Sequence, residues 1–168
     1  MSRMLMISGL FAAALSAETG SAQHSGHPEQ AQRESRIKIR GAAAMGFDQD
    51  TTTHHFRLTP MGGFIQVEVN DSADATGRDS IRAHLREIAG EFTSGDFSKP
   101  FQTHDETPPG VAIMQELKSR IAYQFEETGG GGRVRISTTS SAALSAVHDF
   151  LRYQIREHAT GDPLTVQR

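Results

Sequence analysis

FRLTPMGGFIQVEV (Phe56–Val69) is the stretch that decides the fold, because its design returns later in the chain as YQFEETGGGGRVRI (Tyr123–Ile136). The two stretches are equal in length, and each places glycines between two runs in which apolar and polar residues alternate. Alternation with a period of two is typical of a β-strand with one buried face. Glycines supply the positive φ angles that tight connections between strands require. Each stretch therefore predicts a β-hairpin.

The alternation also predicts which face of each hairpin is buried. The apolar positions are Phe56, Leu58, Ile65, Val67 and Val69 in the first hairpin and Tyr123, Phe125, Val134 and Ile136 in the second. The opposite face carries Arg57, Gln66, Glu68, Gln124, Arg133 and Arg135. We interpret this polar face as solvated, since antiparallel sheets commonly leave one side in water.

A helical pattern follows each hairpin after a short polar stretch. The first apolar stripe has helical spacing and Asp79 near its expected start, and it consists of Ile81, Leu85, Ile88 and Phe92. The second has Ser140 or Ser141 as its expected N-cap, and it consists of Leu144, Val147, Leu151 and Ile155. The chain thus contains two β-β-α units, at about residues 54–95 and 121–161.

Two such units predict an α+β fold. A two-layer sandwich, with an antiparallel sheet of four or more strands and two main helices on one face, is the economical way to bury both stripes. We expect residues 36–168 to form this single domain. RIKIRG (Arg36–Gly41) also alternates and predicts a further short strand. In the 96–120 segment, Pro108-Pro109-Gly110 breaks any regular element, and Val111, Met114 and Leu117 predict one short helix after it.

The first 22 residues have the composition of a secretory signal peptide. Arg3 precedes an apolar run from Met4 to Leu15, and the small residues Gly20-Ser21-Ala22 follow. The run is shorter than the ~20 residues that span a membrane, so we expect cleavage after Ala22 and no membrane anchor. Residues 23–35 contain little to bury and predict a disordered tether. The chain is therefore predicted to be a periplasmic or secreted bacterial protein.

Composition narrows the classes of function. The chain has 17 basic and 20 acidic residues and a formal net charge of −3, so no strong field favours nucleic acid. It has no cysteine, hence no disulfide or thiolate chemistry. No Gly-x-Ser-x-Gly or HExxH motif is present, and no nucleophile is paired with a base. These features favour a binding or accessory protein over an enzyme.

Eight histidines in a chain without cysteine suggest a transition metal, copper or zinc, because neutral imidazole is a common ligand for both. In DTTTHHFRL (Asp50–Leu58), strand geometry turns His54 toward the core and His55 toward the outer face. His84 and His148 border the two helical stripes. We expect His54, His84 and His148 to converge near one end of the core and to form a metal site.

Weaker candidate ligands are His55, Asp50 and His104, the last of which lies in THDE (Thr103–Glu106) of the central segment. The alternative is that each histidine is separately hydrogen-bonded at a margin of the core. A second hypothesis concerns a different surface: the polar sheet face could hold a protein partner or form a homodimer, as a non-catalytic interaction domain does.

Three strings carry a resemblance to a family. MGFDQDTTTHHF (Met45–Phe56), THDETPPGV (Thr103–Val111) and HDFLRYQIREHATGDP (His148–Pro163) resemble a family of small exported bacterial proteins without an established activity. The resemblance extends from about Met45 to Asp162. It implies export and a single domain. Because the family has no established activity, the resemblance assigns neither a cofactor nor a site residue.

Overall fold

The computed structural model describes residues 32–33, 35–37, 39–41 and 45–168. The predicted signal peptide and most of the predicted tether lie outside the described residues. Within the described part, no helix has the length and apolar character that crossing a membrane requires.

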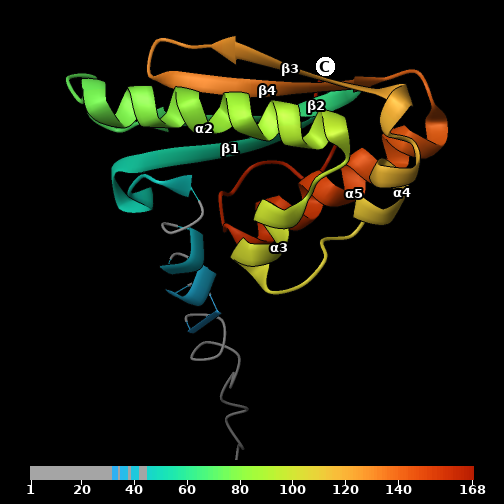
Figure 1. Cartoon of the computed structure of the whole chain (residues 1–168), viewed down its shortest axis with the longest axis horizontal. Helices are drawn as coiled ribbons and strands as arrows, with labels where there is room; N and C mark the ends of the chain where they lie inside the picture. The colour runs from blue at the N-terminus through green and yellow to red at the C-terminus, as the bar shows by residue number, and fades with distance from the viewer. Residues whose placement is uncertain (1–31, 34, 38, 42–44) are drawn as a thin grey trace, which may run out of the picture.

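The predicted α+β sandwich is confirmed. Four antiparallel strands form one sheet in the order β1-β2-β4-β3: β1 (Thr52–Thr59), β2 (Gly62–Val69), β3 (Ile121–Glu127) and β4 (Gly131–Thr138). Two long helices, α2 (Ala75–Ser94) and α5 (Ser141–Glu157), cover one face (Figure 1). Each helix crosses to the other repeat, because α2 packs mainly on β3 and β4 while α5 packs mainly on β1 and β2.

The segment between the repeats is more ordered than the sequence predicts. The expected short helix is α4 (Val111–Glu116), which leads into the 3-10 turn η2 (Lys118–Arg120). An unexpected helix, α3 (Ser98–His104), precedes it. Phe97 at the start of α3 is buried, and its ring stacks on Phe92 of α2 at 4.3 Å between centroids. Phe97 therefore anchors α3, a helix that is too short to show a clear apolar periodicity in the sequence.

Capping explains where the long helices begin. Ser140 accepts a hydrogen bond from the backbone N–H of Ala143, which confirms the predicted N-cap of α5. The expected start of α2 near Asp79 is wrong, because Asp74 accepts from the N–H of Gly77 and starts the helix one turn earlier. The polar first turn of α2 hides this start from a search for apolar periodicity.

The β2–β4 ladder joins the two repeats, and glycines allow its strands to approach. A Cβ atom at Gly62 of β2 would collide with the backbone carbonyl of Ile136 in β4, and one at Gly131 of β4 would collide with the backbone carbonyl of Val67 in β2. In the first turn Gly62 has a φ of 147°, as expected. The expectation of positive φ in the second turn, residues 129–132, is wrong.

The predicted strand at Arg36–Gly41 is also wrong, because the described residues 35–37 and 39–41 are helical. Helical geometry separates the two isoleucines of RIKIRG: Ile37 is 4% exposed and Ile39 is 71% exposed. The C-terminal segment occupies part of the outer edge of β1. The carboxylate of Asp162 accepts from the N–H of Phe56, and the N–H of Gln167 donates to the carbonyl of Leu58.

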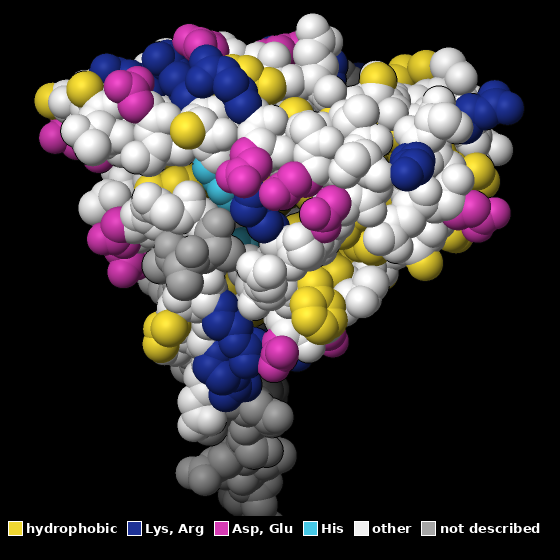
Figure 2. Space-filling view, viewed as in Figure 1, with side chains coloured by type: hydrophobic (Ala, Val, Ile, Leu, Met, Phe, Trp, Pro, Cys, Tyr) yellow, Lys and Arg dark blue, Asp and Glu magenta, His cyan; other side chains and the backbone are white. Residues whose placement is uncertain are grey.

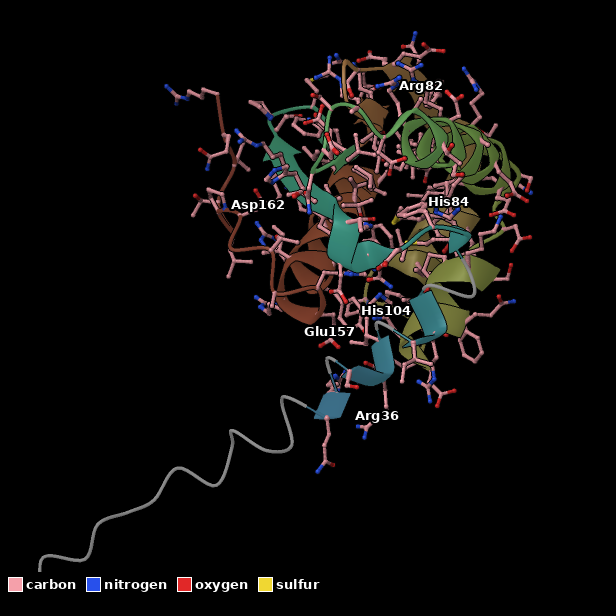
Figure 3. All side chains as sticks on the ribbon, turned by 90° about the vertical axis from the view of Figure 1, so that its left-hand side faces the viewer. Arg36, Arg82, His84, His104, Glu157 and Asp162 are labelled. Carbon is pink, nitrogen blue, oxygen red and sulfur yellow. The ribbon has the colours of Figure 1, made fainter. Side chains whose placement is uncertain are left out.

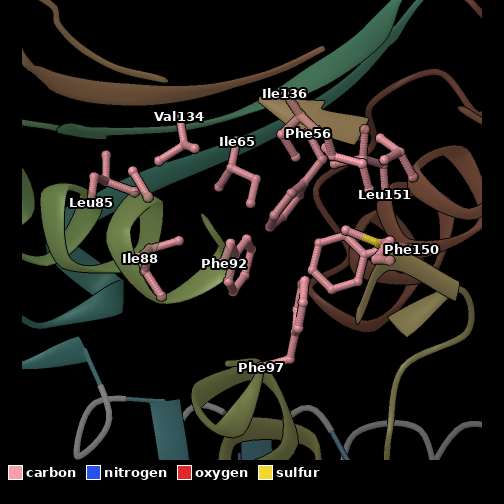
Figure 4. Packing of buried hydrophobic residues seen from close by; sticks show 14 of the residues in the cluster. Phe56, Ile65, Leu85, Ile88, Phe92, Phe97, Val134, Ile136, Phe150 and Leu151 are labelled. Carbon is pink, nitrogen blue, oxygen red and sulfur yellow. The ribbon is translucent and has the colours of Figure 1, made fainter. Parts of the chain in front are cut away.

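Aromatic rings fill the space between the sheet and the helices. Phe92 of α2 meets Phe150 of α5 edge-on at 5.9 Å, and Phe97 meets Phe150 at 6.2 Å (Figure 4). Val134 and Ile136 of β4 cover this cluster from the sheet side. Burial of such side chains stabilises by about 1.5–3 kcal/mol each, so this cluster contributes much of the stability of the domain.

The Gly131→Ala variant tests the ladder between β2 and β4. We expect it to lower the free energy of unfolding by about 1–3 kcal/mol, since the added methyl group meets a backbone carbonyl that cannot move aside. The matched control is Gly90→Ala in α2, where nothing lies within 4 Å of the new Cβ and alanine should stabilise the helix by about 0.5–1 kcal/mol. Urea unfolding of both variants measures the difference, and equal effects would contradict the packing described.

Candidate ligand pocket

A cavity of about 70 Å³ lies between β1, β2, α2, α3 and α5. Its apolar wall consists of Met45, Phe56, Ile65, Val67, Leu85, Ile88, Phe92, Pro100 and Phe150. Its polar positions are His54, His84, Lys99, Thr103, His104, Gln154 and His158. Figure 2 shows histidine side chains reaching the surface in the middle of one face, beside acidic and basic side chains. We call this site the histidine pocket.

Two of its histidines share an aromatic neighbour. The ring of Phe47 stacks on His54 at 6.1 Å and meets His84 edge-on at 5.6 Å. Burial, followed by the charge of the neighbouring His55, lowers the pKa of His54 to about 4. Burial, followed by the nearby charge of Lys99, lowers the pKa of His84 to about 4. Both imidazoles are therefore neutral at neutral pH.

The other two histidines face them from α3 and the end of α5. The rings of His54 and His158 are stacked at 5.7 Å with 11° between their planes, and His104 meets His158 edge-on at 5.1 Å. Burial is the main cause that lowers the pKa of both His104 and His158. Neutral rings can stack in this way, whereas two imidazolium ions at this separation would repel each other.

One hydrogen bond fixes the deep end of the pocket. Nε2 of His104 lies 3.0 Å from Oε1 of Gln154, and the two residues are only 7% and 4% exposed. Gln154 belongs to the last turn of α5 and His104 ends α3. This pair therefore ties the segment between the repeats to the second repeat.

The charged residues at the pocket are held in ion pairs. Nζ of Lys99 forms ion pairs of 2.7 Å with Glu87 and with Glu91. Farther out, Arg33 pairs with Glu106 and with Glu157, both at 2.6 Å. In Figure 3, His104 and Glu157 lie beside the N-terminal helical segment that carries Arg36. Arg33 thus connects the C-terminal part of the predicted tether to the domain, and the described residues 32–33 and 35 are helical.

The expected convergence of His54, His84 and His148 does not occur. His54 and His84 line the pocket, but Nε2 of His148 lies 3.0 Å from the carbonyls of Thr59 and Gly62. Both partners accept, so this nitrogen carries a hydrogen and donates it. Thr59 is five residues beyond His54 along β1, about 16 Å at the rise of a strand. His148 instead holds the turn of the first hairpin.

The weaker candidates have different positions. His55 donates from Nδ1 to the carboxylate of Asp162 at 3.1 Å, and this contact holds the C-terminal segment against β1. Asp50 lies in the 3-10 turn η1 (Gln49–Thr51), and its N–H donates to Asp48. Neither residue lines the pocket. Only His104, the third of the weaker candidates, belongs to it.

The arrangement does not form a metal centre with three ligands. In the parts of the chain that the structure describes, no three His, Asp or Glu side chains are grouped so as to hold a metal ion. Binding of copper or zinc by fewer of these histidines stays a prediction. The geometry is that of a small cavity with an apolar wall and a few polar groups, which is the usual composition of a small-molecule site.

Sequence reasoning missed His158, Gln154, Lys99 and Phe47. A signal for two of them was present, since Phe150, Gln154 and His158 follow one another at spacings of four and share one face of α5. Lys99 and Phe47 lie in segments without periodicity, and their positions depend on how α3 and the strand β1 are placed in space. No pattern in the sequence could indicate them.

Several charges on the polar sheet face pair with one another. Glu126 accepts from Arg133 at 2.6 Å and from Arg135 at 2.7 Å, and the Arg133 guanidinium lies over the ring of Phe64. These charges are paired within the sheet.

Comparisons with protein-family models, with curated proteins and with solved structures returned no match for this chain.

The neutral histidines predict a dependence of stability on pH. Because the folded pKa of His54 and His84 is about 4 and the ordinary value is 6.5, the unfolded chain binds more protons than the folded chain between these values. The free energy of unfolding should therefore fall as the pH falls from 6.5 to 4, by up to about 1.4 kcal/mol per pH unit for each histidine.

Urea unfolding at a series of pH values measures this slope. The slope should become shallower in His54→Leu and in His84→Leu, and shallower again in the double variant. A wild-type slope that the double variant leaves unchanged would contradict burial of neutral imidazoles at this site.

Proposed function

We propose that the protein is an exported binding protein that takes a small molecule into the histidine pocket. The observation that carries this proposal is the composition of the cavity: nine apolar side chains form its wall, and unpaired nitrogen atoms of His54, His104 and Gln154 are buried around it. A cavity left only by imperfect packing is typically lined by apolar atoms alone. Export is supported by the composition of residues 1–22.

Binding is favoured over catalysis by the state of the polar groups. The four imidazoles are neutral and buried, and Lys99 is held by two carboxylates. Among the described residues, no hydroxyl nucleophile is hydrogen-bonded to any of these imidazoles. The carboxylates of Asp105 and Glu106 form ion pairs with arginines of the N-terminal segment. The pocket thus offers shape and hydrogen bonding without an activated group.

A cavity-filling substitution tests this proposal. Val67 lines the cavity, so Val67→Leu should occupy part of its volume with little loss of stability and should weaken the binding of small ligands. The matched control is Val134→Leu, at a fully buried valine of the same sheet that does not line the cavity. This control should lose about 1–3 kcal/mol through overpacking and should bind ligands normally.

The measurement is the change in backbone amide NMR signals during titration with small neutral molecules, for example cyclopentanone and 2-pyrrolidinone. We expect the shifted signals to cluster at residues that line the histidine pocket and to shift less in Val67→Leu. Signals that stay unchanged in the wild-type protein, or that shift only elsewhere, would contradict the proposed function.

A further inference from the structure

Three polar atoms at the pocket are buried without a hydrogen-bond partner among the described residues: Nε2 of His54, Nδ1 of His104 and Nε2 of Gln154. Each of these side chains lines the same cavity. An unpaired buried polar group costs about 1–3 kcal/mol, and folding alone gives no reason to gather three of them at one place. A bound molecule with matching groups would remove this cost.

The His104–Gln154 pair determines what those groups are. If Nε2 of His104 carries the hydrogen, it donates to Oε1 of Gln154, and the pair keeps a lone pair on the imidazole and a free amide N–H. With the opposite tautomer and amide orientation, the amide donates to the imidazole, and the pair keeps an imidazole N–H and a free carbonyl. Either assignment leaves one donor and one acceptor.

The same conclusion requires that His104 be neutral, because an imidazolium would present only donors. Burial lowers the pKa of His104 and so favours the neutral form. The surroundings also disfavour a charged ligand, since the wall is apolar and the charge of Lys99 is engaged by Glu87 and Glu91. A complementary ligand is therefore neutral and offers one acceptor and one donor.

Size sets the last limit. A cavity of about 70 Å³ holds about five water-sized positions, given that one water needs roughly 10–15 Å³. This space suits a molecule of about five or six heavy atoms. Nearly all of such a molecule would contact the apolar wall, so only one small functional group can meet the polar end.

We propose, on the basis of the function proposed above, that the ligand class is a small neutral amide or lactam, whose adjacent C=O and N–H groups bind the free donor and acceptor of the His104–Gln154 pair. The rest of the molecule lies against Phe56, Phe92 and Phe150. The remaining nitrogen of His54 gives the ligand a second polar neighbour.

Three five-membered rings of nearly equal size test this proposal by NMR titration of the wild-type protein. 2-Pyrrolidinone carries both groups, cyclopentanone carries only the acceptor, and pyrrolidine is a cation at neutral pH. We expect 2-pyrrolidinone to bind about tenfold more tightly than cyclopentanone, as one net hydrogen bond would give. Pyrrolidine should bind more weakly than both.

The Gln154→Met variant keeps the side-chain shape and removes the amide. It should weaken the binding of 2-pyrrolidinone about tenfold, because either assignment gives Gln154 one hydrogen bond to this ligand. Cyclopentanone should be weakened as well if the amide N–H is the free donor, and should be unchanged if the imidazole N–H is the free donor. Gln124→Met is the matched control, because Gln124 is exposed on the polar sheet face and should not affect either ligand.

The outcomes separate the two proposals. Equal binding of 2-pyrrolidinone and cyclopentanone at the pocket, or tighter binding of pyrrolidine, would overturn the amide assignment and leave the binding function standing. Failure of all three rings to bind at the pocket would overturn both. The comparison of ligands on the wild-type protein decides the matter even if Gln154→Met does not fold.

Discussion

The structure depends on the antiparallel ladder between β2 and β4. This ladder joins the two repeats through their second strands, so each helix follows its own hairpin and then crosses over the other repeat. It is possible because glycine occupies positions such as Gly131, where a side chain would meet the backbone of the neighbouring strand. Without this close approach the two helices would have no common sheet to cover, and the aromatic cluster between them would be exposed to water.

The histidine pocket follows from this arrangement. Residues of α2, α3 and α5 line the cavity together with β1 and β2, and Phe47 contacts two of its histidines. Histidines from four separate segments meet there, one from each of β1, α2, α3 and the end of α5. Their neutrality is a physical consequence of burial beside apolar side chains and beside one another.

Much of the fold could be predicted from the sequence, because the periods of 2 and 3.6 residues directly report which face of an element is buried. The same rule placed His54 and His84 on inward faces correctly. It could not place His148 relative to them, since the position of a residue along a helix says nothing about which end of a strand that residue meets. His104 and His158 needed the path of α3 and of the C-terminal segment, which depends on contacts such as Phe97 with Phe92.

The central claim is that four neutral imidazoles line a cavity made for a neutral polar group. Nitrogen NMR of the imidazole side chains of His54, His84, His104 and His158 tests it most directly, because the nitrogen shifts distinguish the two neutral tautomers from the imidazolium ion. At about pH 5, below the ordinary histidine pKa, the account predicts that His54 and His84 each keep one protonated and one unprotonated nitrogen. Imidazolium signals from these two residues in the folded protein at this pH would contradict the account.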